Sequence, residues 1–341
     1  MAKRWVIRPD GSNWGDWGED DQRGRMNLVT SECRLNGVAE IQEGLCYCLS
    51  MPLDMPGGNA VNPKRLPPAF GTVHYPPDSN SPYYNFDWNA IQEGNMDVTS
   101  DEHVTIYSQY STQWDSLAHV GSLFDVNGDG ILEQVYYNGY RKGEHIKGPD
   151  DPEGPGARAL GVENMATGGM QGRGVLVDFH AHFGDERVAV GYDLLMEILG
   201  KDEIRVEEGD FFLFHTGWDD MILSMKGKPD AKRLHASGAV LDGFDKKMLQ
   251  WITDSGVVAL ISDNMAVEAP DGYGETQGGF SRLPIHRHCL FRLGVHLGEI
   301  WYLSELAHAL RIRGRSRFFL TAPPLRLPGA VGSPVTPIAT I

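Results

Sequence analysis

Three short apolar runs in the second half of the chain limit its fold most strongly: residues 174–179, 210–215 and 257–262. Each is bounded by Gly, Asp or Ser and has the length of a buried strand. Apolar residues recur at spacings of three and four in residues 191–199, 242–253 and 303–310, which predicts amphipathic helices. Strands therefore mix with helices late in the chain and with loops earlier, which predicts a mixed α/β domain without a regular doubly wound order.

The domain organisation is expected to be simple. No linker divides the 341 residues, so we expect one domain over residues 1–341. Within it, residues 1–92 are rich in Pro, Gly and aromatic side chains and are expected to form a loop-rich N-terminal portion that wraps the core.

Charge and cysteine content indicate which binding partners and which cellular compartment to expect. The net charge is −16, from 30 basic and 46 acidic residues, and it disfavours nucleic acid as a partner. No long apolar stretch predicts a membrane span. Four cysteines are too few for a disulfide framework in a chain of this length, and they favour a reduced, cytoplasmic location.

The segment 111–119, Ser-Thr-Gln-Trp-Asp-Ser-Leu-Ala-His, carries the strongest chemical signal. Gln113 and Asp115 would point to the same side of an extended segment, and His119 could reach that side after a turn. An amide, a carboxylate and an imidazole at these spacings suit a metal-dependent hydrolytic site, provided that other segments supply further ligands.

Residues 284–299 offer those ligands, since they contain His286, His288 and Glu299. On a helix starting near residue 286, positions 286, 289, 290 and 293 share one face. Only one of the two histidines can then point inward, and we choose His286.

Two glycine-containing segments imitate binding loops. Residues 125–133 begin like a calcium loop, but the position of the bidentate Glu is occupied by Tyr136, so a hairpin turn is favoured. Residues 168–174 are rich in glycine but precede a strand and lack the Gly-Lys-Ser/Thr ending, which disfavours a phosphate loop.

Seven segments carry a further signal: residues 12–27, 112–119, 173–178, 215–218, 262–268, 286–299 and 332–337. Together they resemble a known family of metal-dependent cyclase-like hydrolases, which includes bacterial kynurenine formamidase and isatin hydrolase. The chain resembles its longer branch of cyclase family proteins. The resemblance implies a swivelling β/β/α fold: a single domain with a mixed β-sheet or barrel core and peripheral helices.

The family motif H-x-G-T-H-x-D-x-P-x-H can be placed on residues 109–119. Its two metal-binding histidines become Gln109 and Gln113, its aspartate is Asp115, its proline becomes Leu117, and its acid-base histidine is His119. Because an amide oxygen is a weaker zinc ligand than imidazole, this departure favours a harder ion such as manganese.

The later family ligands correspond to His286 and Glu299. The resemblance thus implies one divalent ion, manganese or zinc, held by Asp115, His286 and Glu299 with help from Gln113.

The implied activity is hydrolysis of a C–N bond in an amide or cyclic imide, or of a lactone, in a small cyclic or aromatic molecule. His119, with Asp115, would act as general base and acid. We expect substrate contacts from Gln109, Trp114, Trp88 and Tyr84, and the resemblance implies a homodimer or homotetramer. Two alternatives stay open: a metal-independent cyclase or lyase that uses His119 and Asp115 directly, and a non-catalytic member that binds a small molecule.

Overall fold

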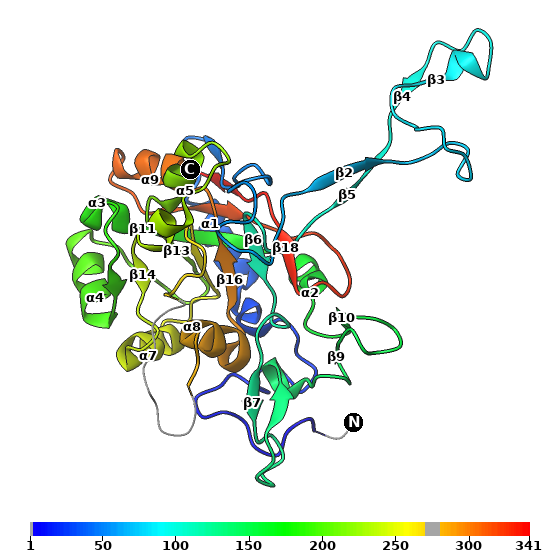
Figure 1. Ribbon diagram of the computed structural model, residues 1–341. Coiled ribbons are helices and arrows are strands. Elements are labelled where there is room, and N and C mark those ends of the chain that lie inside the picture. The colour runs from blue at the N-terminus through cyan, green and yellow to red at the C-terminus, as the bar shows by residue number, and fades with distance from the viewer. Residues whose placement is uncertain (1–2, 270–279) are drawn as a thin grey trace.

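The computed structural model describes residues 3–269 and 280–341, and within them the core is a sheet of nine strands (Figure 1). In spatial order these are β1 (Cys46–Cys48), β19 (Ile338–Thr340), β17 (Arg317–Thr321), β11 (Gln171–Asp178), β13 (Phe211–His215), β15 (Ala259–Ser262), β16 (His296–Glu299), β6 (Gln113–Asp115) and β18 (Gly332–Pro334).

The centre of this sheet is parallel and its flanks are antiparallel. Strands β11, β13, β15 and β16 run parallel, while β17, β19 and β1 on one side and β6 and β18 on the other pair antiparallel. The three predicted strands are β11, β13 and β15, so they are confirmed. In the described residues the pairings end at β1 and at β18, which makes the core a curled mixed sheet and not a closed barrel.

Both faces of the sheet are buried, as the uninterrupted apolar strands require. Phe212 and Phe214 of β13 point into one core cluster, and Phe211 and Leu213 point into the other. The first face is covered by α4 (Tyr192–Lys201) and α7 (Lys246–Asp254), and the second by α9 (Ser304–Arg311). These are the three predicted helices, and the fold class predicted from the sequence is confirmed.

The remaining elements are shorter and surround this core. The helices are α1 (Ser31–Val38), α2 (Val162–Gly168), α3 (Phe179–Phe183), α5 (Trp218–Ser224), α6 (Ala231–His235), α8 (Pro284–His286), the π-helix η4 (Arg287–Leu293) and the 3-10 helices η1 (Gly24–Leu28), η2 (Trp88–Ala90) and η3 (Tyr137–Gly139). The two-stranded ribbons are β2 (Ala69–Thr72) with β5 (Glu102–Thr105), β3 (Phe86–Asp87) with β4 (Val98–Thr99), β7 (Ser122–Phe124) with β8 (Glu133–Val135), β9 (Ile146–Lys147) with β10 (Gly156–Ala157), and β12 (Ala189–Val190) with β14 (Val240–Leu241).

Both glycine-containing segments have structural roles. The segment that begins at Asp125 is the predicted hairpin connection between β7 and β8, and the Asp125 carboxylate accepts the amides of Gly128, Asp129 and Gly130. Gly169 ends α2 in a left-handed conformation, with φ at 70°, and β11 follows.

The N-terminal portion divides into two parts. Trp5, Trp14, Met26 and Leu49 are buried in the core. Residues 69–92 instead leave the body. Together with residues 93–105 they form a projecting structure, here called the arm, that starts with β2 and returns with β5 (Figure 1). No helix in the described part of the chain is both long and apolar enough to cross a bilayer.

Candidate metal centre

Two antiparallel strands place the polar groups of the site. In the register of β6 with β16, Gln113 lies opposite Glu299 and Asp115 lies opposite Leu297. The Gln113 amide donates from Nε2 to Glu299 Oε2 at 2.9 Å, across 186 positions of sequence. Gln113 and Asp115 share one face of β6, as their spacing predicted.

Trp114 lies on the other face of the same strand. Its ring packs edge-on against Trp301, with centroids 5.1 Å apart, and its Nε1 donates to the Ala322 carbonyl at 2.8 Å. The side chain is fully buried in the second core cluster. The expectation that Trp114 contacts substrate is therefore corrected: strand alternation turns it into the core.

His286 enters the site from α8, and its orientation is set by Glu268. Glu268 Oε1 accepts both the His286 backbone amide at 2.8 Å and Nδ1 of its ring at 2.9 Å. A proton on Nδ1 leaves Nε2 directed at Glu299, whose Oε1 is 3.1 Å away. His288 turns instead to Thr253 Oγ1 at 2.9 Å, so the inward choice of His286 agrees with the structure.

Ligand atoms of Asp115, His286 and Glu299 lie within 4.8 Å of one another, and all three residues are buried. Among the described residues, both carboxylate oxygens of Asp115, Oε1 of Glu299 and Oε1 of Gln113 have no hydrogen-bond partner, although Oε1 of Glu299 lies 3.1 Å from His286 Nε2. Buried oxygens without partners are costly unless something absent from the chain satisfies them. A divalent cation fits this set, because it is an acceptor of lone pairs from carboxylate, imidazole and amide groups.

A second acidic and imidazole cluster has a different character. His215, Asp219 and Asp263 are equally close to one another and equally buried. Their polar atoms are nevertheless satisfied: His215 contacts Asp178 at 2.8 Å and Ser304 at 3.0 Å, and each oxygen of Asp219 and Asp263 accepts a hydrogen bond. This cluster is therefore an ionic network that joins β13, β15 and α9, and its carboxylate oxygens have hydrogen-bond partners without an ion.

The pKa of His215 supports this distinction between the two clusters. Burial opposes the charged form of His215, but hydrogen bonds to Asp178 and Asp219 outweigh it and raise the pKa to about 10. His215 is therefore a buried cation that balances the carboxylates around it.

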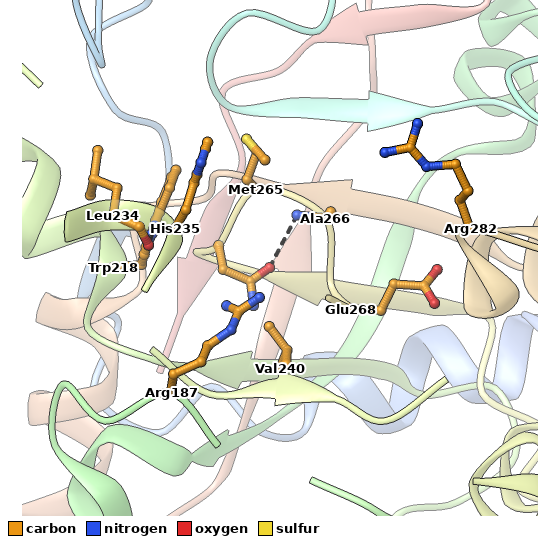
Figure 2. A pocket seen from close by; sticks show the side chains of 10 residues that line it. Arg187, Trp218, Leu234, His235, Val240, Met265, Ala266, Glu268 and Arg282 are labelled. Atoms are coloured by element: carbon orange, nitrogen blue, oxygen red, sulfur yellow. Dashed lines mark hydrogen bonds between the residues drawn. The ribbon is translucent and has the colours of Figure 1, made fainter. Parts of the chain in front are cut away.

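Asn264 connects the turns that carry the two glutamates. Its side-chain oxygen accepts the amides of Ala266 (Figure 2, dashed line) and Val267, and its backbone carbonyl accepts the amide of Ile300. Val267 precedes Glu268 and has a φ of 49°, and Ile300 follows Glu299 and has a φ of 57°. β-branched residues rarely adopt such angles, and residues held in this way are concentrated at functional sites.

His119 lies at the open side of the cluster, with about a quarter of its side chain exposed. Its Nε2 is 3.6 Å from Asp115 Oδ2 and its Nδ1 is 3.4 Å from the Gln109 amide. Burial lowers the pKa of His119, in spite of the opposing charge of Asp115, so the imidazole is neutral at pH 7. Burial, reinforced by Glu299, raises the pKa of Asp115 to about 6.

Arg65 is a site residue that the sequence analysis missed. Its guanidinium donates to the Gln109 carbonyl. Its positive charge adds to the lowering of the His119 pKa and partly opposes the rise in the Asp115 pKa that burial causes. It stands in a proline-containing loop with no motif around it, so no local signal marks it.

Glu268, which orients His286, also lines a small cavity (Figure 2). It has a volume of about 200 Å³ and is lined by apolar side chains, among them Trp218 and Met265, and by polar ones, among them Arg187 and His235. Glu268 and Asn264 line this cavity, whereas Asp115, His286 and Glu299 do not.

Tyr84 and Trp88, both expected near substrate, lie in the arm. Trp88 packs there against Tyr75, Tyr83 and Phe86, and Tyr84 is 48% exposed. Within one chain the structure does not bring either residue to Asp115, because the arm projects from the body (Figure 1).

Several solved structures share the fold of this chain. A crystal structure described as a novel cyclase is 30% identical, covers 97% of each chain and superposes with a TM-score of 0.74. Isatin hydrolase A from Ralstonia solanacearum is 17% identical over 89% of this chain and 94% of its own, with a TM-score of 0.53. An isatin hydrolase bound to the product analogue thioisatinate is 14% identical over 92% of this chain and 99% of its own, with a TM-score of 0.52.

These isatin hydrolases share the fold. A comparison with curated proteins found no match to the sequence. Residues 47–269, more than half of the chain, match the family described as "Putative cyclase". The chain belongs to this cyclase family.

Proposed function

We propose that this chain is a metal-dependent hydrolase that opens an amide, cyclic imide or lactone bond in a small cyclic or aromatic molecule. The observation that carries the proposal is the set of buried oxygens without partners on Gln113, Asp115 and Glu299, facing Nε2 of His286. The names of the isatin hydrolases that share the fold support the reaction class.

Asp115, His286 and Glu299 would hold one divalent ion, manganese or zinc, with Gln113 as a further oxygen donor. When bound, such an ion supplies a Lewis acid for a carbonyl oxygen and makes a water molecule more acidic. Glu268 keeps the His286 ring in position, and the Gln113 amide keeps the Glu299 carboxylate in position. The ligands are thus oriented before substrate arrives.

His119 is suited to move the proton. It is neutral at pH 7, it is partly exposed, and it is close to Asp115 Oδ2. Nε2 of His119 would accept the proton of the attacking water and return it to the leaving nitrogen or oxygen. Gln109 contacts the other ring nitrogen and would hold the imidazole in this orientation.

The test combines elemental analysis of the purified protein with a screen of isatin, formamides, cyclic imides and lactones, before and after chelation. We expect Asp115→Asn to lose both the ion and turnover. His119→Ala should retain the ion but lose turnover by a factor of about 10² to 10⁴. Asp263→Asn is the matched control, because it removes a buried carboxylate from the satisfied network, and it should retain the ion.

Two results would contradict the proposal. Turnover that is unchanged after complete removal of metal would favour a metal-independent cyclase or lyase. A bound ion together with tight ligand binding and no turnover on any of these substrates would favour a non-catalytic binding protein.

A further inference from the structure

Gln109 is held beside His119 by contacts of both its backbone and its side chain. The Arg65 guanidinium donates to the Gln109 carbonyl, and Nε2 of the Gln109 side chain lies 3.4 Å from Nδ1 of His119. The next residue, Tyr110, is buried, and its hydroxyl accepts the Gly57 amide at 2.9 Å. The backbone at Gln109 is therefore fixed against the loop that carries Arg65.

A glycine leaves the space in which the Gln109 side chain lies. Gly332 of β18 lies opposite Asp115 of β6, so a side chain at residue 332 would share the face of the sheet that carries Asp115. A Cβ on Gly332 would lie 2.3 Å from Gln109 Nε2 and 2.7 Å from Gln109 Cδ. The Gln109 amide thus occupies the place that a side chain at residue 332 would take.

The orientation of this amide determines which ring nitrogen of a neutral His119 carries the proton. Nε2 of Gln109 can only donate, so Nδ1 of His119 accepts from it and the ring proton lies on Nε2. Nε2 of His119 faces Asp115 Oδ2 at 3.6 Å, and the negative charge of Asp115 favours a proton there. In this state Nε2 has no lone pair with which to take a proton from water.

Rotation of the Gln109 amide by half a turn reverses this arrangement. It exchanges a donor for an acceptor of nearly the same size, so Oε1 of Gln109 then accepts a proton on Nδ1 of His119 and Nε2 has a lone pair. Binding of a divalent ion by Asp115 favours this second state. The carboxylate lone pairs are then used by the ion, and the positive charge of the ion repels a proton on Nε2.

We propose that Gln109 is a positioning residue that couples the tautomer of His119 to occupation of the metal centre. In the metal-free protein Nε2 of His119 carries the proton, and in the loaded protein Oε1 of Gln109 holds the proton on Nδ1, which makes Nε2 the base. In the change, Nε2 gives one proton to water and Nδ1 takes one from water, which the exposed quarter of the His119 side chain allows. The inference rests on the proposed function, because it takes from it the ion and the role of His119.

The test measures the tautomer directly and needs no substrate. In protein labelled with ¹⁵N only at its 12 histidines, couplings between ring nitrogens and the protons on ring carbons show which nitrogen is protonated. The spectrum of His119→Ala identifies the His119 signals by their loss. At pH 8, where the lowered pKa leaves the His119 ring neutral, we expect Nε2–H in the metal-free wild type. After loading with Zn²⁺, which is diamagnetic, we expect Nδ1–H.

Two substitutions of Gln109 should have different effects. Gln109→Glu offers only acceptor oxygens, so His119 should carry its proton on Nδ1 both with and without zinc. Gln109→Met has a similar length and no amide, so its zinc-loaded form should contain both tautomers. Its zinc affinity should equal that of the wild type, while turnover of any substrate found in the screen should fall by about 10- to 100-fold.

A glycine substitution tests the same point without changing Gln109. Gly332→Ala should reproduce the Gln109→Met spectrum, because the added Cβ displaces the Gln109 amide. The matched control is Gly200→Ala in α4, where an added Cβ has nothing within 4 Å, and it should switch tautomer as the wild type does.

Zinc that binds without changing the wild-type tautomer would overturn the inference. It would also be overturned if zinc-loaded Gln109→Met held a single Nδ1–H tautomer, or if metal-free Gln109→Glu still carried the proton on Nε2. A lack of zinc uptake by the wild type has a different meaning, because it would contradict the proposed function and, with it, the coupling.

Discussion

Glu268→Gln tests the most detailed claim about the metal centre, which is that one carboxylate orients the imidazole ligand. Glu268 accepts three hydrogen bonds: from the Ile285 amide at 2.9 Å, the His286 amide at 2.8 Å and His286 Nδ1 at 2.9 Å. A glutamine has one acceptor oxygen, so its NH₂ group must face at least one of these donors. The substitution also removes the negative charge that makes the ring a stronger ligand.

The expected loss follows from these contacts. Changing a partner that orients a metal ligand costs about 10- to 100-fold in affinity, or about 1.4 to 2.8 kcal/mol. A buried amide left without its acceptor costs about 1 to 3 kcal/mol of folding stability. Affinity for Mn²⁺ or Zn²⁺ is measured by competition with a chelator of known strength, and stability is measured by urea unfolding of the metal-free protein.

Asp263→Asn separates the two effects. Asp263 is also fully buried, and it accepts the amides of Thr216 at 2.8 Å and Trp218 at 2.9 Å, but it does not touch His286. Asp263→Asn should retain the ion, and its change in stability is measured in the same urea experiment. An unchanged affinity in Glu268→Gln, or an equal loss of affinity in Asp263→Asn, would refute the orienting role.

Three further predictions concern buried polar side chains. In the metal-free protein at pH 8, Asp115→Asn should raise the free energy of unfolding by on the order of 1 to 3 kcal/mol, because burial raises the pKa of Asp115 to about 6 and its oxygens have no partners; a less stable variant in urea would contradict this. Gln113→His should shift the preference toward zinc over manganese by about tenfold, measured by the same chelator competition, since imidazole replaces a neutral amide oxygen; an unchanged ratio would remove Gln113 from the ligand set. For His215 the folded pKa is raised to about 10 from 6.5, so its stabilisation is complete below pH 6.5 and is lost as the pH rises through 10. His215→Gln should therefore cost on the order of 2 to 5 kcal/mol in urea at pH 6.5 and little near pH 10, and a cost that does not depend on pH would contradict a charged His215.

Local patterns predicted those parts of the site that local geometry decides. Gln113 and Asp115 share a face because side chains alternate along any strand. His286 was chosen from the face of an α-helix that would begin there, but it ends α8 and a π-helix follows, so the contact with Glu268 orients it. The same alternation sends Trp114 to the core, which the assignment to substrate overlooked. Arg65 could not be found in this way, since its position beside Gln109 depends on how a long loop crosses the body.

The sequence by itself determined the types and approximate limits of the elements, because apolar periodicity and turn residues act over a few neighbouring positions. It also brought the candidate ligands to notice through their motif. Only the tertiary structure decided which clusters can accept an ion. His215, Asp219 and Asp263 have the same residue types as Asp115, His286 and Glu299, yet backbone amides from distant segments satisfy the first set and leave oxygens of the second without partners. The direction of the arm was likewise decided by the tertiary structure, because the sequence of residues 69–105 does not show whether this segment packs on the body or projects from it.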